Sequence, residues 1–550
     1  MLDVSATTSM SPGSQYLSQT IASYFLLVTV VILVTRVWLS ESSRPKPIKM
    51  KSSSSRDDTR PLPGPYGIPV LGNMLSLGRS DPHLSLMNLA KKFGSIFQIR
   101  LGSRPVLVLN GYEAIHKALI KQAVIFAGRP KLFTFELINN GGNSETSLTF
   151  ANYGETWKVH RKLAESSLRH FTAGSQVKFV ESVVSSEASE LVQHIKSMTC
   201  DENNNNNNTT STQCKSLPEN VGNIRNVLRL AVSNVMCWFM FSKRHTYEDE
   251  ALLKLISISD RFTAAAGSGN PVDFMPWLRI FFQKATSDFK AMLKEFRTFV
   301  TGNLLDAHTA EYKDGSERDI IDHLVTSGRR FNQDENKKTS IDEGVLLDTC
   351  FDYFGAGFET VSTTFEWCLL YMAAYPDIQC KLQQEIDEVV GQDRMPSLQD
   401  RDKLPLVQSC ILEILRHSTP VTFAIPHSTT SDTVLDGFFV PKDTVVFTNL
   451  YSAHFDPEVW DEPEKFDASR FLTSEGSIDL EMKKHVIPFS VGRRRCIGSD
   501  LARIELFLFF SIFLQNFSIE HSQDGPVSME GIDGLARRPK HFNVNLISRK

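Results

Sequence analysis

One cysteine, Cys496, has the neighbourhood best suited to chemistry in this sequence. It follows three consecutive arginines, Arg493–Arg495, lies between Gly492 and Gly498, and precedes an apolar helical run. The positive end of a helix dipole and nearby guanidinium groups both favour a thiolate over a thiol. Such a thiolate acts either as a nucleophile or as a metal ligand. A nucleophile would need a partner histidine and an oxyanion hole, which no motif supplies, whereas an axial metal ligand needs only the one cysteine.

The composition is that of an ordinary globular protein. The chain has 550 residues, of which 41% are hydrophobic and 22% are charged, and its formal net charge is −4. This balance argues against a nucleic-acid-binding protein, which normally carries a clear basic excess. The eight cysteines are sparse and form no Cys-x-x-Cys pair, so we expect no disulfide framework.

A segment near the N-terminus predicts a membrane anchor. Residues 21–39 are almost entirely apolar, and at about 1.5 Å per residue they can cross a hydrocarbon core of about 30 Å. No lysine or arginine precedes them, whereas six basic residues follow between positions 44 and 60. By the positive-inside rule, residues 1–20 are luminal and the bulk of the protein faces the cytoplasm. A cleaved signal peptide is the alternative, but the basic n-region and the small-residue cleavage site that it needs are missing.

The rest of the chain predicts a linker and one large domain. Residues 40–69 form a basic, proline-rich linker, and residues 70–550 form a catalytic domain that is mainly α with small β-sheets, an α+β fold. The asparagine-rich insertion at 201–213 cannot pack a core and is expected to be disordered. The pattern predicts two early strands at 96–102 and 105–111 and a long helical stretch at 113–416. It then predicts further short strands within 420–447 and a late buried helix at 500–517. Charged residues in the first two turns of the late helix argue against a second membrane span.

The cysteine loop resembles the haem-binding signature of the cytochrome P-450 superfamily. The matching pattern is Phe489-x-x-Gly492-x-Arg494-x-Cys496-x-Gly498. The resemblance implies the cytochrome P-450 fold, haem b as the cofactor and Cys496 as the ligand to its iron.

Two other stretches support the same resemblance. The segment from Glu413 to Arg416 resembles the Glu-x-x-Arg helix of the superfamily, and Arg470 in FDASRF would complete a network that holds the haem-side core. Ala468-Ser469 replaces the Pro-Glu that many members have at that place. The resemblance covers the chain from about Pro61 to the C-terminus, except the asparagine-rich insertion.

The resemblance also implies catalytic and haem-binding residues. The stretch FGAGFETVST, residues 354–363, resembles the oxygen-binding part of a long central helix, with Glu359 and Thr360 as the acid–alcohol pair that delivers protons. Its two glycines cost about 1 kcal/mol each relative to alanine in a helix, and a widened groove above the haem explains them. Haem contacts are implied for six residues: Trp157, Arg161, His427, Phe489, Arg494 and Cys496.

Within the superfamily, the sequence most resembles animal family 1, the aryl hydrocarbon hydroxylase type. Agreement is nearly continuous around residues 267–279 and 417–433. The steroid 17α-hydroxylase branch shares several stretches and is the alternative. Family 1 implies a narrow pocket for flat aromatic molecules, bordered by Phe135, Phe262, Asp352, Gly355 and Ala356.

The implied activity is monooxygenation, in which one atom of O2 enters a hydrophobic substrate such as a planar xenobiotic, an oestrogen or a fatty acid. No Gly-x-Gly-x-x-Gly follows a predicted strand, so a separate NADPH–cytochrome reductase must supply electrons, with cytochrome b5 as a further partner. The implied location is the endoplasmic reticulum membrane. Two other classes stay open: a haem-thiolate isomerase or dehydratase, which tends to lose the alcohol at Thr360, and a haem-binding protein without catalysis.

Overall fold

A computed structural model of the chain describes residues 60–78, 80–139, 147–200, 224–266, 270–313, 317–333, 343–522 and 527–549. The predicted anchor at 21–39 and the insertion at 201–213 lie outside these residues. Among the residues that are described, no helix is long and apolar enough to cross a membrane.

Most of the described chain is helical, as the sequence predicted. The helices are α2 (Pro82–Phe93), α3 (Tyr112–His116), α4 (Phe133–Ile138), α5 (Glu155–Thr172), α6 (Val177–Cys200), α7 (Ile224–Phe241), α8 (Glu250–Ala266), α9 (Pro271–Phe274), α10 (Gln283–Val300), α11 (Asp306–Glu311), α12 (Ile320–Asn332), α13 (Glu343–Ala374), α14 (Pro376–Val389), α15 (Pro405–Ser418), α16 (Leu450–His454), α17 (Leu480–Lys483) and α18 (Ser499–Asn516). Proline opens α2, α14 and α15, where its missing N–H costs no helical hydrogen bond.

The strands form small sheets at the edges of the helical body. They are β1 (Ile96–Leu101), β2 (Arg104–Leu109), β3 (His427–Ser428), β4 (Thr433–Leu435), β5 (Phe438–Val440), β6 (Val445–Thr448), β7 (Phe517–His521), β8 (Gly531–Ile532), β9 (Arg538–Pro539) and β10 (Val544–Ser548). The largest sheet has the order β1-β2-β6-β3, in which β2 and β6 are parallel and the other pairs are antiparallel. The predicted hairpin and the short strands after position 420 are confirmed.

The end of the predicted linker belongs to the folded body. The N–H of Gln98 in β1 donates to the carbonyl of Pro63, and Arg60 forms a bridge with Phe438 in β5. The carbonyl of Gln98 lies so close to Gly64 that a Cβ there would approach it to 1.9 Å. The folded part of the chain therefore starts by residue 60, earlier than the predicted boundary at 70.

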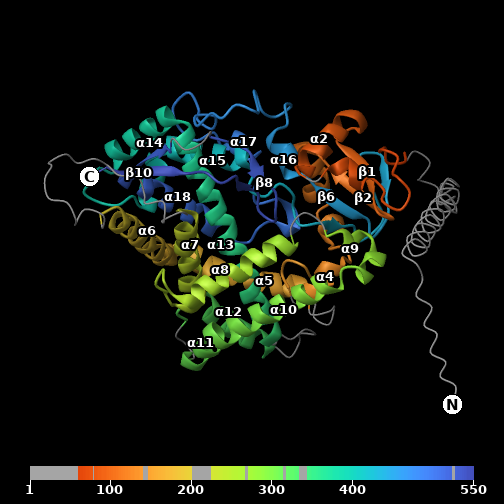
Figure 1. The fold of residues 1–550 in the computed structure, drawn as a ribbon, viewed down its shortest axis with the longest axis horizontal. Coiled ribbons are helices and arrows are strands. Elements are labelled where there is room, and N and C mark those ends of the chain that lie inside the picture. The colour runs from red at the N-terminus through yellow and green to blue at the C-terminus, as the bar shows by residue number, and fades with distance from the viewer. Residues whose placement is uncertain are drawn as a thin grey trace, which may run out of the picture.

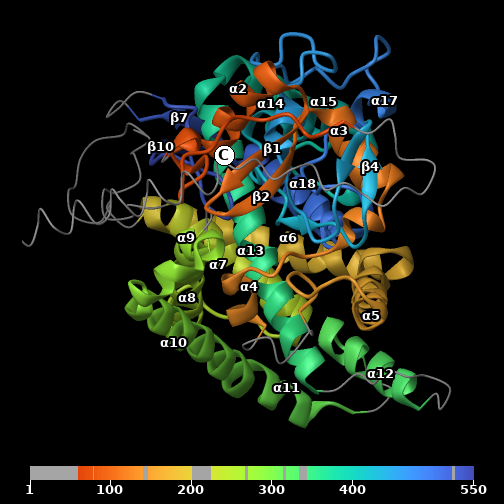
Figure 2. The same ribbon diagram turned by 90° about the vertical axis from the view of Figure 1, so that its right-hand side faces the viewer.

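Helix α13 is the central element of the fold. It runs through the middle of the molecule, with α14, α15 and α18 at one end and α10, α11 and α12 at the other (Figures 1 and 2). Apolar residues occupy all sides of this helix, which is the pattern of a helix packed against others around its circumference. Phe365 of α13 contacts Phe509 and Phe513 of α18, so the helix after the cysteine loop packs directly against the central helix.

A buried ion network ties α15 to the segment before the cysteine loop. Both side chains of the Glu413–Arg416 pair are completely buried, and they form two hydrogen bonds of 2.7 and 2.9 Å. Arg470 donates to the same carboxylate at 3.0 Å. Arg416 also donates to the carbonyls of His454 and Pro463. The predicted network of Glu413, Arg416 and Arg470 is therefore present.

Replacing Glu413 should destabilise the fold strongly. Glu413→Ala leaves the Arg416 guanidinium buried without its carboxylate, which typically costs about 3–5 kcal/mol. We expect the midpoint of urea unfolding to fall sharply. The control is Glu481→Ala, which breaks an exposed ion pair with Lys484 and should cost less than about 1 kcal/mol. Equal midpoints for the two variants would show that the buried network does not stabilise the fold.

Candidate functional site

The cysteine loop is held in one backbone conformation. Gly492 has φ +80°, and a Cβ there would lie 2.0 Å from the carbonyl oxygen of Leu119, so only glycine fits. Gly498 has an ordinary φ of −86° and open space around it. The N–H of Cys496 donates to the carbonyl of Phe489 at 2.9 Å, which closes the loop. The ring of Phe489 lies 4.6 Å from the Arg503 guanidinium of α18. Gly492 thus sets the turn, whereas the space at Gly498 leaves room for a bulky group.

The Cys496 side chain keeps an exposed surface, but desolvation still acts on its thiol. This burial raises the pKa of the thiol, while the N–H of Gly498 and the guanidiniums of Arg161 and Arg503 lower it. Burial thus opposes the thiolate that the neighbouring positive charges favour. A metal ion coordinated at the sulfur would add a further positive charge in favour of the thiolate.

Arg494 points away from the cysteine into a cage of backbone carbonyls. Its guanidinium donates to Ala127 at 2.9 Å, to Leu148 at 3.2 Å and to Ala151 at 2.8 Å. It also lies 3.9 Å from the ring of Trp157, whose indole N–H donates to Leu148 as well. Burial and two neighbouring guanidiniums lower the pKa of Arg494 to about 7. Arg494 and Trp157 are thus brought together by one short segment of chain.

Arg129 belongs to the same site, although the sequence did not single it out. Its guanidinium is buried and donates to the carbonyls of Thr149, Ile425 and Pro426. The backbone N–H of Arg129 donates to the side-chain oxygen of Asn152. Burial and the charge of Arg161 lower the pKa of Arg129 to about 9. The only sequence signal was an arginine inside the otherwise apolar stretch VIFAGRP, which does not reveal its partners.

His427 and Arg161 lie at the borders of this cluster. The His427 ring nitrogen Nδ1 is 2.7 Å from the carbonyl of Phe126, and burial followed by the charges of Arg129 and Arg494 lowers its pKa well below the ordinary value. Arg161 forms an ion pair with Glu165 at 2.8 Å and donates to the carbonyl of Arg495 at 2.6 Å. The imidazole therefore belongs to the same buried neighbourhood, and Arg161 joins α5 to the cysteine loop.

The buried charges at this site require an anion. Among the described residues, neither Arg129 nor Arg494 has a carboxylate within ion-pair distance, and carbonyl oxygens alone balance their charge. Buried charges in proteins are normally paired, because desolvation is expensive. Two buried guanidiniums, together with a cysteine on the loop that follows Arg494, fit a cofactor that carries both a metal and carboxylates. The propionates and iron of haem meet that requirement.

The middle of α13 opens onto an internal space. Ala356 is exposed, although Phe354 and Phe358 on either side of it are fully buried. A Cβ on Gly355 would meet nothing within 4 Å, whereas one on Gly357 would lie 2.6 Å from the Met236 side chain of α7. The two glycines thus differ in their roles: Gly355 adds to the open groove, and Gly357 lets α7 approach closely.

Glu359 and Thr360 have different partners in this structure. The hydroxyl of Thr360 donates to the carbonyl of Ala356 at 2.8 Å. The carboxylate of Glu359 is buried and forms an ion pair of 2.9 Å with Arg229 of α7, which also pairs with Asp260 of α8 at 2.8 Å. Neighbouring positions on the helix therefore hold an alcohol beside the groove and an acid within an ion network.

A second ion pair follows along the same two helices. Glu366 lies 3.1 Å from Arg225, about two helical turns beyond Glu359. Burial raises the pKa of Glu366 to about 7, although Arg225 opposes this shift. The α7–α13 interface therefore contains two stacked acid–arginine pairs.

Asp352 anchors the chain segment that surrounds the buried cations. Its carboxylate accepts from the N–H of Leu148 at 2.6 Å and from the hydroxyl of Ser147 at 3.1 Å. Burial raises the pKa of Asp352 to about 6, and these hydrogen bonds oppose the shift. Because Leu148 also accepts from Trp157 and Arg494, Asp352 acts on the cation cluster through the backbone of this segment.

The two predicted pocket aromatics lie in separate ring groups. Phe135 contacts Phe150 edge to face at 4.9 Å between ring centroids. Phe262 contacts Phe351 of α13 and Phe289 of α10, each at 6.1 Å. Both predicted rings are half-buried. The first group includes Phe150, in the segment that Asp352 holds, and the second includes Phe351 of α13 itself. Both groups therefore lie next to the stretch from Asp352 to Ala356.

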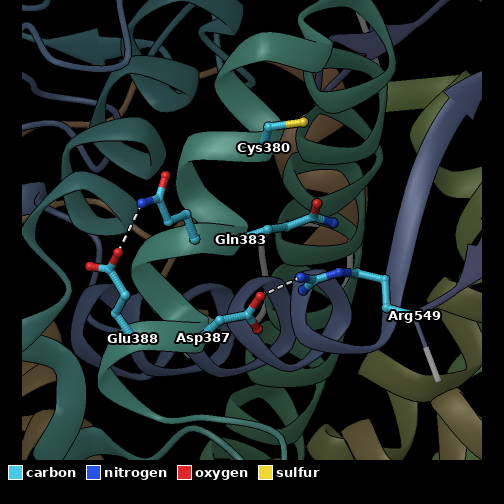
Figure 3. A pocket seen from close by; sticks show the side chains of 6 residues that line it. Cys380, Gln383, Asp387, Glu388 and Arg549 are labelled. Carbon is cyan, nitrogen blue, oxygen red and sulfur yellow. Dashed lines mark hydrogen bonds and ion pairs between the residues drawn. The ribbon is translucent and has the colours of Figure 1, made fainter.

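A surface depression of about 410 Å³ lies elsewhere, along α14 (Figure 3). It is lined by Cys380, Gln383, Gln384, Asp387, Glu388 and Arg549. Arg549 and Asp387 form an ion pair of 2.6 Å across it. None of these residues belongs to the predicted site, and the groups that could bind a ligand already pair with one another.

Comparison with known proteins points to one family. Residues 62–546 match the family described as Cytochrome P450. The chain is 37% identical over 535 residues to "Cytochrome P450 1A1" of Rattus norvegicus, covering 95% of this chain and 94% of that protein. It is 40% identical over 489 residues to the protein of the same name from Oryzias latipes, with 88% and 90% covered. The corresponding protein of Homo sapiens is 36% identical over 537 residues, with 96% and 98% covered.

Substitution of Gly492 should disrupt the cysteine loop. Gly492→Ala forces a Cβ against Leu119 in a backbone conformation that favours glycine, so Cys496 should be displaced. We expect the reduced, carbon monoxide-treated protein to lose the strongly red-shifted Soret band of thiolate ligation. The matched control is Gly302→Ala, which lies between α10 and α11, meets nothing within 4 Å and should keep the band. A normal band in Gly492→Ala would show that the loop tolerates another conformation.

Substitution of Arg129 should weaken haem retention. Arg129→Gln removes one of the two buried cations, and a hydrogen bond to a charged group contributes about 1.5–3 kcal/mol. We therefore expect haem transfer to an excess of apomyoglobin to become roughly 10- to 100-fold faster. Arg104→Gln is the control, because its guanidinium donates to the exposed carbonyl of Lys131 instead. An unchanged transfer rate in Arg129→Gln would mean that this cation serves only the packing of segment 147–152.

Proposed function

The chain belongs to the cytochrome P450 family, and we propose that it is a family 1 haem-thiolate monooxygenase that oxidises flat, hydrophobic molecules at the endoplasmic reticulum membrane. The observation that carries this proposal is the Cys496 thiol on a glycine-dependent loop, together with the buried Arg129 and Arg494, which have no carboxylate partner among the described residues. The three relatives above share the name of an enzyme of this family over nearly the whole chain.

The residues present would hold haem b at both its iron and its propionates. Cys496 would bind the iron, and Arg129, Arg494 and His427, with Trp157 and Arg161 from α5, would hold the propionates. Bound haem supplies the redox chemistry by which one oxygen atom of O2 enters a C–H bond or an arene, and a thiolate ligand favours O–O cleavage. Phe489 supports the cysteine loop through its carbonyl and its contact with Arg503.

Thr360 is the proton donor closest to the reacting atoms in this proposal. Its hydroxyl donates to the Ala356 carbonyl beside the open groove and keeps its lone pairs free to accept from a water molecule. Glu359, held by Arg229, is the carboxylate that resupplies protons to this alcohol. An alcohol that lies between a groove and a buried acid can relay a proton from the acid to the groove. The charged carboxylate then stays outside the groove.

The aromatic lining supports a preference for flat substrates. Phe135 and Phe262 stack on the ligand, and Gly355 and Ala356 border it from α13, where a small residue and an absent side chain leave a flat surface. Asp352 contributes indirectly, because its carboxylate is already bound by Ser147 and Leu148. Aromatic rings prefer offset-stacked or edge-to-face contacts, so a planar arene fits such a lining better than a bulky aliphatic ring system.

Electrons come from a membrane-bound NADPH–cytochrome reductase in this proposal, with cytochrome b5 as a further donor. Arg493 and Arg495 are exposed on the cysteine side, where they can attract an acidic partner. Exposed apolar side chains also gather near the N-terminal end of the described chain, at Trp277, Ile280 and Phe281. They follow α9, which packs against the β1–β2 turn, and together with the predicted anchor they favour contact with a membrane.

The decisive experiment is a substrate panel with the reconstituted system. The full chain, reductase, lipid, NADPH and O2 are incubated with polycyclic arenes or with pregnane steroids of similar hydrophobicity. We expect arenes to be oxidised at least tenfold faster than the steroids, because the pocket is lined by stacked aromatics. Faster turnover of pregnanes would support the 17α-hydroxylase alternative, and no turnover by haem-loaded protein would support the non-catalytic one.

Two variants make the outcome specific. Thr360→Ala should consume NADPH while forming severalfold less product and more hydrogen peroxide, since the proton donor is lost. Full activity with normal coupling in this variant would favour a reductase-independent isomerase or dehydratase. Cys496→Ala should lose both turnover and the red-shifted Soret band, and retention of that band would overturn the assignment of the axial ligand.

A further inference from the structure

Two histidines and a glutamate meet where α5 packs against α12, outside the haem site. His170 lies near the C-terminal end of α5, Glu317 lies just before α12, and His323 lies in its first turn. One ligand atom from each residue lies within 4.8 Å of the others. The two imidazole rings stack at 4.5 Å with an angle of 28°. His170 is 13 residues from Trp157 along the helix, which is about 20 Å at 1.5 Å per residue.

The hydrogen bonds of His323 determine which of its nitrogens is free. Nδ1 lies 3.2 Å from the hydroxyl oxygen of Ser167, and that hydroxyl donates its own proton to the carbonyl of Leu163 at 3.0 Å. The hydroxyl of Ser327 also lies 3.4 Å from Nδ1. Because the proton of Ser167 is already used, Ser167 can only accept from His323, and a proton on Nδ1 satisfies this shorter contact. Nε2 then presents its lone pair, as in histidines that bind metals with Nδ1–H bonded to an oxygen.

The free nitrogen of His323 faces a carboxylate rather than a donor. Its Nε2 lies 3.9 Å from Oε2 of Glu317, too far for a hydrogen bond. A lone pair facing a carboxylate is unfavourable unless a cation lies between them. Metal–ligand bonds of about 2.0–2.2 Å to nitrogen and oxygen allow one ion to bind both atoms at this separation. Burial followed by the neighbouring His170 keeps the pKa of His323 below its ordinary value, although Glu317 opposes this shift, so the neutral ligand form predominates at neutral pH.

We propose that His170, Glu317 and His323 form a binding site for a divalent transition-metal ion of the zinc type. Two imidazoles and one carboxylate are a ligand set typical of Zn²⁺, Cu²⁺ and Ni²⁺, whereas Mg²⁺ and Ca²⁺ prefer oxygen alone. His170 is exposed, so the site can be reached from solvent and leaves a position for water. The bound ion would link the end of α5 to the start of α12.

A second histidine–carboxylate cluster, formed by His308, Asp319 and Asp322, has charges that pair with one another. His308 lies 3.2 and 2.9 Å from carboxylates of Asp319 and Asp322, which are hydrogen-bonding distances. Arg318 donates to Asp322, and Ser242 donates to Asp319. One imidazolium and one guanidinium thus balance two carboxylates without any further ion. The charge balance is weaker at the proposed site: among the described residues, Glu317 forms an ion pair with Arg330 at 4.0 Å, and that guanidinium is mostly exposed.

The test is Zn²⁺ binding by the full haem-loaded chain, measured by isothermal titration calorimetry. His170→Ala should remove one binding event or weaken it by more than about tenfold, since loss of even an outer partner of a ligand costs 10- to 100-fold. His541→Ala removes another exposed histidine and should bind like the unaltered chain. Ser167→Ala frees the Nδ1 proton of His323 and should weaken binding by about tenfold.

A second measurement separates metal binding from folding. Zn²⁺ should raise the melting temperature of the unaltered chain with the logarithm of the free Zn²⁺ concentration above Kd and should leave that of His170→Ala unchanged. Because His170 is exposed, its replacement should not alter the fold or the carbon monoxide spectrum. The proposal is overturned if the unaltered chain and His170→Ala bind Zn²⁺ with the same affinity and stoichiometry, or if Mg²⁺ binds as tightly as Zn²⁺.

Discussion

Buried positive charge that has no acidic partner among the described residues is the constraint around which the cysteine side of this protein is organised. Arg129 and Arg494 lie among carbonyl oxygens contributed by the segment 147–152 and by chain on either side of it. Such an arrangement is expensive until an anion enters, because carbonyl dipoles replace only part of the lost hydration. The site is therefore built for a cofactor that brings negative charge, and folding and cofactor binding are energetically linked.

Helix α13 connects this cation cluster to the groove where a substrate would lie. Through Asp352 it holds Ser147 and Leu148, and through Gly355 and Ala356 it leaves space. About one and three turns further along, Glu359 and Glu366 each pair with an arginine of α7. The alcohol of Thr360 and the acid of Glu359 occupy neighbouring helix positions, which point about 100° apart. This separation lets acids of the ion network lie near the groove without exposing charge to a hydrophobic ligand.

The cysteine loop depends on two kinds of restraint. Locally, Gly492 adopts a positive φ under the carbonyl of Leu119, and the N–H of Cys496 closes the turn on Phe489. At longer range, the buried pair of Glu413 and Arg416, joined by Arg470, fixes the chain that leads into the loop. The thiol itself gains little from the arginines beside it, because Arg494 turns toward Trp157 and the charges that matter come from α5 and α18.

The sequence by itself determined those features that depend on short stretches of chain: the hairpin of β1 and β2, the helical body, the buried α18, the cysteine loop and the i,i+3 pair of Glu413 and Arg416. Each has a local pattern of glycine, apolar spacing or paired charge that survives without knowledge of distant neighbours. Only the tertiary structure decided that Arg129 joins Arg494, that Glu359 pairs with Arg229, and that the Asp352 carboxylate is already engaged. The physical reason is that the partners of a buried polar group come from distant parts of the chain. Desolvation, which sets its charge and its hydrogen bonds, exists only once those parts have packed together.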